Sequence, residues 1–419
     1  MTASPGKTSK KNNITNNEIA SNEVASNGIA SNEVVSNEIA ILGALCLFLS
    51  AVEYMIPKPF PFMRIGLANL PLMLACTIFP LRAYLILVCV KVFGQALITG
   101  TLFSYVFVFS FTGSFLSAVL MFGLYHALSQ RHVSFIGIGT AGALVSNLSQ
   151  ICLAHVFIFG GNVLYIAPPF LAAGLITGVS LGVFCEIFIK NSNWYRNRLD
   201  KTPINNEIHE TAFLDKKPLT FFPATKFYNN YFGSKALFIA GFLVIPSLVF
   251  NSSTEYRCAQ FLFFLLLACL FGRKVNIIIT FLVTFFIIVF NLIIPYGRVL
   301  LYIGGFTITK GALEAGIHRA VTLQALFMLS KVTIRQDLAL PGRFGELLGE
   351  SLRMFSRLIS RGKTKLKKNP IETIDNLLFD LAQSKPAAAV NQGIRTKPAG
   401  YFVLIIIVLI SWLPWIIII

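Results

Sequence analysis

The stretch PKPFPFMRIGLANLPL, from Pro57 to Leu72, interrupts a hydrophobic part of the chain with closely spaced prolines and a single arginine, Arg64. Prolines lack a backbone N–H and resist helix interiors. In a membrane, irregular backbone is tolerated only where it packs against protein or lines a cavity. The stretch therefore predicts a break between two membrane-spanning helices, held against protein rather than facing lipid.

The composition around this stretch is that of a membrane protein. Of the 419 residues, 55% are hydrophobic and 13% are charged, and the mean hydropathy is +0.71, which predicts a polytopic membrane protein. The first apolar run begins near Ile39, so we expect insertion through uncleaved helices. The net charge of +17 comes largely from basic residues between hydrophobic runs, which the positive-inside rule explains better than nucleic-acid binding.

Six apolar segments follow the polar N-terminus, and most are long enough to cross a hydrocarbon core of about 30 Å. They cover about 39–56, 66–80, 82–99, 101–128, 135–159 and 163–189. Basic residues after the fourth and sixth segments belong on the cytoplasmic side, and an even number of spans places the N-terminus there too. We therefore expect an all-α protein of the cytoplasmic membrane, with a first membrane domain over residues 39–190.

Two polar regions flank this domain. Residues 1–38 contain variants of the pentad NEIAS, whose period fits neither helix nor strand, and are predicted to form a low-complexity, disordered tail. Residues 191–234 are polar with scattered prolines and predict a cytoplasmic linker. A second membrane domain is predicted over residues 235–419, with apolar runs at about 235–250, 256–271, 275–296 and 401–419.

Within the second domain, residues 308–382 have a different pattern. Charged and apolar residues alternate irregularly up to about 334, which suits a helix leaving the membrane. Next, FGELLGESLRMFSRLISRG (344–362) has apolar residues at helical spacing and places Arg353, Arg357 and Arg361 on the opposite face. We call these three arginines the arginine ridge. Two hypotheses remain for it, docking to a partner protein and binding of anionic lipid headgroups.

Catalytic motifs are missing from the sequence. There is no DDxxD pair of the kind that binds magnesium diphosphate in prenyl-chain synthases. Gly362-Lys363-Thr364 resembles the end of a phosphate-binding loop, but Arg357 stands where its first glycine must be. The seven cysteines form no CxxC and have no histidine partners at metal-ligand spacing. We expect no catalysis by this chain, no cofactor and no metal, and any ATPase or synthase activity would belong to another subunit.

Polar residues near the first break are candidates for substrate binding. Burying such groups in hydrocarbon costs about a few kcal/mol unless they face a cavity or a partner. Glu53 ends the first span, and Arg64 and Asn69 lie in the proline-rich stretch, so together they predict a pocket lined by both charge signs. The alternative is an interfacial ion pair, or side chains that snorkel to the headgroups.

A second polar set lies in the fifth span. Asn147, Gln150 and His155 have spacings that bring them near a common side of a helix, where we predict contact with the substrate. A hydrogen-bond network between helices is the alternative.

Small residues indicate where helices pack closely. Gly174, Gly178 and Gly182 form a GxxxGxxxG series in the sixth span, and Ala40 and Ala44 form an AxxxA motif in the first. Both motifs are predicted to be helix-packing surfaces.

Residues 39–189 resemble the Gx transporter family, often labelled heptaprenyl diphosphate synthase component I, which is similar to the substrate-binding S components of energy-coupling factor (ECF) transporters. The resemblance rests on Glu53, on PFPFMRIGLANLPLMLA, on GTLFS at 100–104 and on the small-residue-rich fifth and sixth spans. It implies a six-helix bundle with both ends in the cytoplasm. It also implies that residues 57–69 gate an outward-facing pocket and that Ala40 and Ala44 meet a T component.

Residues 235–419 resemble the T component of the same transporters more weakly. T components present Ala-Arg-Gly type motifs to ATPase subunits, and Ser360-Arg361-Gly362 is similar, with Ser356-Arg357-Leu358 beside it. The resemblance thus implies a membrane subunit of an ECF-type importer, with ATPase partners and a small or isoprenoid-related substrate. The alternative is a non-catalytic membrane component of heptaprenyl diphosphate synthesis.

Overall fold

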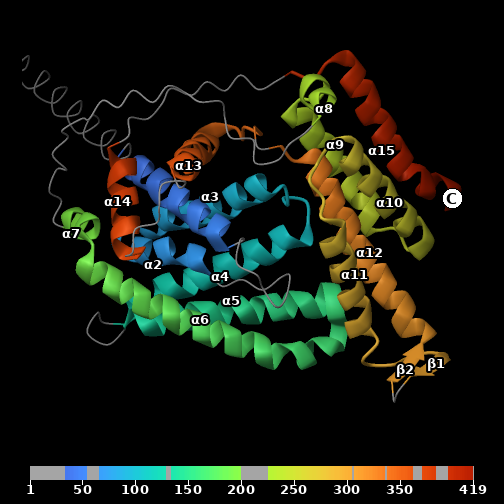
Figure 1. The fold of residues 1–419 in the computed structure, drawn as a ribbon, viewed down its shortest axis with the longest axis horizontal. Coiled ribbons are helices and arrows are strands. Elements are labelled where there is room, and N and C mark those ends of the chain that lie inside the picture. The colour runs from blue at the N-terminus through green and yellow to red at the C-terminus, as the bar shows by residue number, and fades with distance from the viewer. Residues whose placement is uncertain are drawn as a thin grey trace, which may run out of the picture.

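The computed structural model describes residues 34–53, 66–128, 134–199, 225–303, 306–335, 337–361, 370–383 and 395–418. These residues form an almost entirely helical protein (Figure 1). In this part of the chain, four helical runs are long and apolar enough to cross a membrane: Val34–Glu53, Leu81–Thr99, Tyr105–Ala127 and Phe135–Asn191. The chain is therefore an α-helical membrane protein, as its composition predicts.

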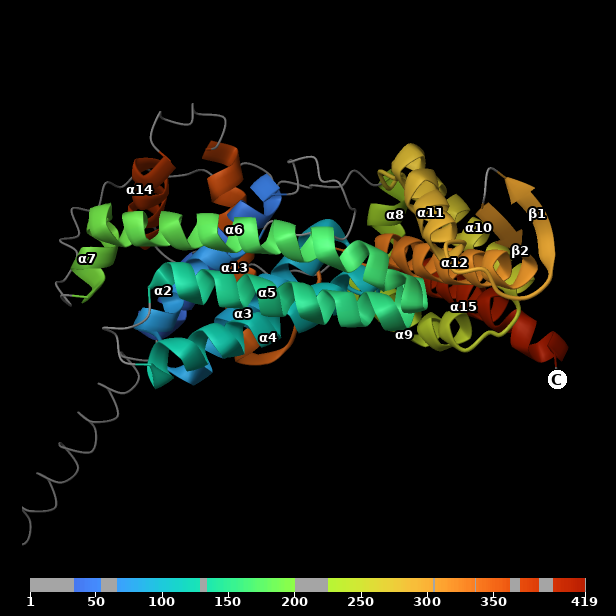
Figure 2. The same ribbon diagram turned by 90° about the horizontal axis from the view of Figure 1, so that it is seen from below.

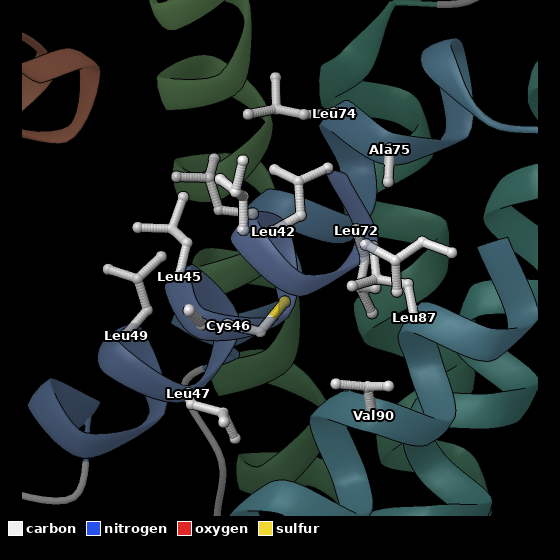
Figure 3. Close-up of a cluster of buried hydrophobic side chains, with 14 of the residues drawn as sticks. Leu42, Leu45, Cys46, Leu47, Leu49, Leu72, Leu74, Ala75, Leu87 and Val90 are labelled. Carbon is white, nitrogen blue, oxygen red and sulfur yellow. The ribbon is translucent and has the colours of Figure 1, made fainter. Parts of the chain in front are cut away.

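The first module comprises the described residues from 34 to 199. Its helices are Val34–Glu53, which we call the first helix, and the elements η1 (Leu67–Asn69), α2 (Leu70–Ile78), α3 (Leu81–Thr99), α4 (Tyr105–Ala127), α5 (Phe135–Ala154), α6 (Val163–Asn191) and α7 (Asn193–Leu199). Leu42 and Leu45 of the first helix pack with Leu72 of α2 and Leu87 of α3 in one buried cluster (Figure 3). Burial of these side chains holds the first helix, α2 and α3 together.

Helices α5 and α6 run antiparallel and lie side by side in both views (Figures 1 and 2). The chain reverses through a π-helical turn, His155–Phe159, and a 3-10 turn, Gly160–Asn162. Gly160 has φ +57°, a left-handed conformation that glycine adopts without a steric penalty. The two predicted spans are thus joined by a tight helical turn rather than by a loop.

The glycine series of α6 faces α5. A Cβ at Gly178 would lie 2.9 Å from the Cα of Thr140, and one at Gly182 would overlap the backbone of Ile136. A Cβ at Gly174 would overlap the side-chain amide of Asn147. Backbones come this close only where side chains are small, so larger residues at these positions would push the two helices apart.

The second module comprises the described residues from 225 to 418. Its elements are α8 (Lys226–Tyr231), α9 (Ser234–Val249), α10 (Thr254–Leu270), α11 (Ile277–Asn291), β1 (Val299–Ile303), β2 (Phe306–Thr309), α12 (Lys310–Thr333), α13 (Gly342–Arg361), α14 (Pro370–Ala382) and α15 (Pro398–Ile418). Helix α12 packs against α9, α10 and α11, and α15 packs against α9. The antiparallel hairpin β1–β2, with Leu301 opposite Ile308, was not expected from the sequence.

The two modules are joined by hydrogen bonds near the α5–α6 turn. The side-chain amide of Asn162 donates to the carbonyl oxygens of Phe290 (2.8 Å) and Asn291 (3.2 Å). In return, the amide of Asn291 donates to the carbonyl oxygen of Ile158 at 3.0 Å. Arg319 of α12 donates to Oδ1 of Asn291 at 2.8 Å. This reciprocal pair ties the end of α11 to the turn of the first module.

A second junction between the modules lies at the C-terminal end of α12. Lys331 donates to the carbonyl oxygen of Thr99 at 2.8 Å, and the hydroxyl of Ser330 accepts from the backbone N–H of Phe103 at 3.0 Å. The loop between α3 and α4 is therefore held against the C-terminal end of α12.

Helices α13 and α14 belong to the second module in sequence but lie over the first (Figure 1). Leu348, Phe355 and Leu358 of α13 and Leu378 of α14 are buried in the same cluster as Leu42 of the first helix. The apolar face of α13, which the sequence predicts, is thus covered by protein.

Candidate functional site

A small cavity lies among the helices of the first module. Its volume is about 40 Å³, which is room for roughly three water molecules. The first helix, the turn at η1 and helices α2 to α6 contribute to its wall, which consists of Ser50, Glu53, Gly66, Ala68, Asn69, Met73, Lys91, Gln95, Ser114, Met121, Gly139, Ala143, Ser146, Asn147, Thr177 and Leu181. Nine of the sixteen lining residues have polar side chains although the surrounding helices are apolar, which makes the cavity the candidate binding site.

Lys91 places a basic group in this cavity from the middle of α3. Its side chain is only 2% exposed. The ammonium group donates hydrogen bonds to Oδ1 of Asn69 and, at 3.3 Å, to the hydroxyl of Ser114. A buried charge is strongly unfavourable unless polar groups surround it, so η1 and α4 supply the partners that let α3 carry this lysine.

Glu53 brings a carboxylate to the same cavity from the end of the first helix. It is 6% exposed, and its Oε2 accepts the backbone N–H of Gly66 at 3.1 Å. Gly66 has φ +88° and opens the turn that runs to Asn69, whose N–H donates to the Gly66 carbonyl oxygen at 2.8 Å. The turn from Gly66 to Asn69 is therefore bound by Glu53 at its first residue and by Lys91 at its last.

Two polar residues of α5 are buried beside the cavity. Asn147 lines the wall, and its side-chain amide donates to the carbonyl oxygen of Phe170 on α6 at 2.9 Å. Gln150 is buried behind Ser146 and donates to its hydroxyl at 3.1 Å. Asn147 thus lines the cavity and joins two helices through this hydrogen bond, whereas its contact with a substrate stays a prediction.

His155 lies elsewhere. It is the first residue of the π-helical turn, it is exposed, and its Nδ1 lies 2.8 Å from the carbonyl oxygen of Gly160. The structure therefore does not bring His155 to the cavity that Asn147 lines, because eight residues of helix place His155 about 12 Å further along the helix axis. Arg64 and most of the proposed gate, residues 57–65, lie outside the described residues.

A close crossing of helices connects the cavity-lining elements to α13. A Cβ at Gly43 on the first helix would lie 2.8 Å from the hydroxyl oxygen of Ser351, and one at Gly94 on α3 would lie 3.3 Å from a methyl group of Leu348. The ring of Phe93 meets that of Phe344 edge to face, with centroids 5.7 Å apart. Ala40 and Ala44 are fully buried in the same cluster. The first helix and α3 therefore line the cavity and also form the surface on which α13 packs.

The opposite side of α13 carries charged residues. Arg353 and Arg357 are half-buried, and both lie close enough to Glu350 to lower its pKa. Burial of Glu350 has the larger effect, so the pKa of its carboxyl is raised overall. Arg361 is the last residue of α13; its side chain and Gly362 lie outside the described part.

Two contacts of polar side chains were not predicted from the sequence. Lys91 stands out as a lysine within an apolar run, yet the sequence does not show that its side chain faces the same cavity as Glu53. Asp375 of α14 accepts hydrogen bonds from the hydroxyl of Ser192 and from the backbone N–H groups of Asn193 (3.2 Å) and Trp194 (3.1 Å). It thus caps α7 from another module, a contact with no sequence signal.

The fold and the cavity define a polytopic helical membrane protein with a polar site inside its first module. Residues 42–188 match the family described as heptaprenyl diphosphate synthase component I, the label that the Gx transporter family carries. Residues 235–336 match a family described as a domain of unknown function (DUF8519). No curated protein matches the chain. No solved structure matches it either.

Proposed function

We propose that this chain is the membrane subunit of an ECF-type ATP-driven importer, which captures a solute in its first module and couples to separate ATPase subunits through its second. The observation that carries the proposal is the position of α13. Its apolar face packs on the first helix and α3, which line the cavity, while Arg353 and Arg357 lie on its other side.

The capture role rests on the buried polar cavity. Glu53 and Lys91 are buried within helices that are otherwise apolar, and protein groups satisfy them. Ionisable groups at such positions mark substrate or ion pathways in membrane proteins. The turn at Gly66–Asn69 continues the proposed gate, so ligand contact with either charged residue would alter the end of that gate.

The coupling role rests on the close packing of α13 against the first helix and α3. Because Gly43 and Gly94 let the side chains of Ser351 and Leu348 approach closely, a displacement of α13 would press directly on the first helix and α3. A movement imposed on the arginine ridge by another subunit would therefore shift the first helix and α3. The chain itself would perform no covalent chemistry, and the ridge would lie on the cytoplasmic side of the membrane, with the N-terminus.

The covered apolar face of α13 also argues against the alternative that the arginine ridge binds anionic lipid headgroups. An amphipathic helix binds a membrane surface by burying its apolar face among acyl chains. Here Leu348, Phe355 and Leu358 are already buried against protein. Docking of the arginine ridge to a partner protein is therefore the better-supported reading.

A second candidate function is a non-catalytic membrane component of heptaprenyl diphosphate synthesis, which the description of the matching family favours. In that function a partner would supply the paired aspartates that bind magnesium diphosphate. Both candidates thus require a partner, and the identity of the partner separates them.

Purification of the tagged full-length chain from its native membranes in mild detergent tests the proposal. We expect nucleotide-binding ATPase subunits to co-purify with the wild type and to be lost from the double variant Arg357→Glu and Arg361→Glu. The variant Arg82→Glu makes the same charge change at the exposed start of α3 and should keep the partners. Recovery of a DDxxD-bearing synthase in place of the ATPases would overturn the proposal in favour of the second candidate.

A further inference from the structure

We propose that the hairpin β1–β2 lies at the boundary between the headgroups and the acyl chains of the bilayer, and that it anchors the start of α12 there. The hairpin projects from the adjoining ends of α11 and α12 (Figures 1 and 2). Residues 294–302, which lead into it and form most of its first strand, are all exposed. Six of them have large apolar or aromatic side chains: Ile294, Tyr296, Val299, Leu300, Leu301 and Tyr302. An exposed apolar segment of this kind marks an interaction surface.

The side chains of β1 favour apolar contact on both faces of the hairpin. Leu301 and Tyr302 follow one another in the regularly paired part of the strand, so their side chains point to opposite faces. Both are exposed, with exposed fractions of 53% and 71%. An antiparallel sheet with one face in water carries polar residues on that face. Because neither face of β1 has this character, the hairpin suits a medium that supplies apolar contact on both sides.

The open edges of the hairpin exclude the centre of the bilayer. Among the described residues the sheet has two strands, so each strand keeps one edge of unpaired backbone groups. Such groups are costly in hydrocarbon, whereas in water an open apolar edge invites pairing with another chain. The headgroup boundary supplies both water and apolar contact, and tyrosine is enriched there. Tyr296 and Tyr302 therefore fit this depth.

Helix α11 places the hairpin at that boundary. Its exposed side chains are apolar, among them Ile278 and Phe281, so this helix faces lipid. Its 15 residues extend about 22 Å of a hydrocarbon core of about 30 Å, and residues 292–298 follow before β1. Arg273 and Lys274 precede α11, and the positive-inside rule places them in the cytoplasm. The hairpin thus belongs to the outer leaflet, and its apolar surface continues that of α11.

The turn between α5 and α6 extends this surface. A Cβ at Gly161 would lie 3.7 Å from the Cδ1 atom of Ile294, so the turn adjoins the segment that leads into the hairpin. Leu164 and Tyr165, which follow the turn, are exposed. Both modules therefore contribute apolar and tyrosine side chains to one lipid-facing region.

Hydrogen bonds fix the hairpin to the start of α12. The backbone N–H of Tyr296 donates to the hydroxyl of Thr309 at 3.1 Å, and that of Lys310 donates to the carbonyl oxygen of Arg298 at 2.8 Å. A Cβ at Gly311 would lie 2.8 Å from a ring carbon of Tyr296, so the ring packs closely on the first turn of α12. A hairpin held in the headgroup region would therefore hold this end of α12 as well.

Site-specific photo-crosslinking of the full-length chain in its native membranes tests the proposal. The photoreactive residue p-benzoylphenylalanine takes the place of Tyr302, and the irradiated protein is analysed by mass spectrometry. We expect phospholipid adducts at this position and at Phe281 of α11, and none at Asn376, which is exposed on α14. Adducts of position 302 with another protein or with a second copy of this chain, in place of lipid, would overturn the proposal.

The leaflet is tested with a membrane-impermeant maleimide in sealed right-side-out vesicles. We expect Arg298→Cys, at the start of the hairpin, to be labelled without permeabilisation. The matched variant Arg343→Cys, at the exposed start of α13, should be labelled only after the vesicles are opened. The unsubstituted chain gives the background from its own seven cysteines. Labelling of Arg298→Cys only in opened vesicles would place the hairpin on the cytoplasmic side and overturn its assignment to the outer leaflet.

Discussion

Gly43 and Ser351 lie in direct contact across the crossing of the first helix and α13. A Cβ at Gly43 would lie 2.8 Å from the hydroxyl oxygen of Ser351 and 2.9 Å from a methyl group of Val90. These two residues are more than three hundred positions apart in the sequence. Their contact shows that α13, a helix of the second module, packs on the elements that line the cavity.

Gly43→Ala is expected to loosen the packing of α13 on the first helix. The added methyl group has no room, and overpacking of this kind destabilises a protein by about 1–3 kcal/mol. We expect a lower unfolding temperature and faster tryptic cleavage after Arg353. Gly123→Ala on α4 is the matched control, because a Cβ there meets nothing within 4 Å. If the two variants behave alike, close packing at Gly43 does not hold α13 in place.

Gly174→Ala is expected to disturb the cavity through Asn147. The new methyl group would overlap the Asn147 amide, which would lose its hydrogen bond to Phe170. A double-mutant cycle with Asn147→Ala isolates the effect. We expect Gly174→Ala to cost less stability in the Asn147→Ala background than in the wild type, measured by thermal unfolding. Additive effects would show that the two residues do not interact.

Asp375→Ala is expected to detach α14 from α7. The substitution removes the acceptor for the hydroxyl of Ser192 and for two backbone N–H groups, at Asn193 and Trp194. Buried donors left without an acceptor cost about 1–3 kcal/mol each. Unfolding of the variant should therefore begin at a lower temperature, whereas Asn376→Ala, which changes an exposed residue of α14, should have little effect. Equal unfolding curves would argue that the cap contributes nothing.

Glu350 gives a prediction for the pH dependence of stability. Burial raises the pKa of its carboxyl in the folded protein, so the folded state binds this proton more tightly than the unfolded state. Stability from this group is therefore greatest at low pH and declines as the pH rises from the ordinary glutamate pKa through the raised one. We expect the wild type to lose stability relative to Glu350→Gln over that window, measured by unfolding temperature at successive pH values. A difference that stays constant with pH would contradict the shift.

Much of the helical architecture could be predicted from the sequence because it depends on apolar runs. The runs at 235–250 and 256–271 correspond to α9 and α10, and the periodicity of 344–362 corresponds to α13. Helical periodicity shows which face is apolar but not what covers it. The packing of α13 on the first helix is therefore seen only in the structure.

The hairpin and the site were harder to predict. Strands β1 and β2 are short and lie beyond the last residue of α11, where the apolar run toward 296 continues without a clear change of period. For His155, the spacing argument considered the direction around the helix but not the rise of about 12 Å over eight residues, which carries this side chain away from the cavity. Lys91 was visible as a polar residue, but the rotation of α3 that points it toward Asn69 depends on packing between helices.

The reciprocal hydrogen bonds of Asn162 and Asn291 have a consequence for stoichiometry. Because they and the continuous chain join one first module to one second module, each cavity is matched to a single α13. In an importer built this way, capture proteins would not compete for a shared coupling subunit. The rate of uptake would then follow the abundance of this one polypeptide.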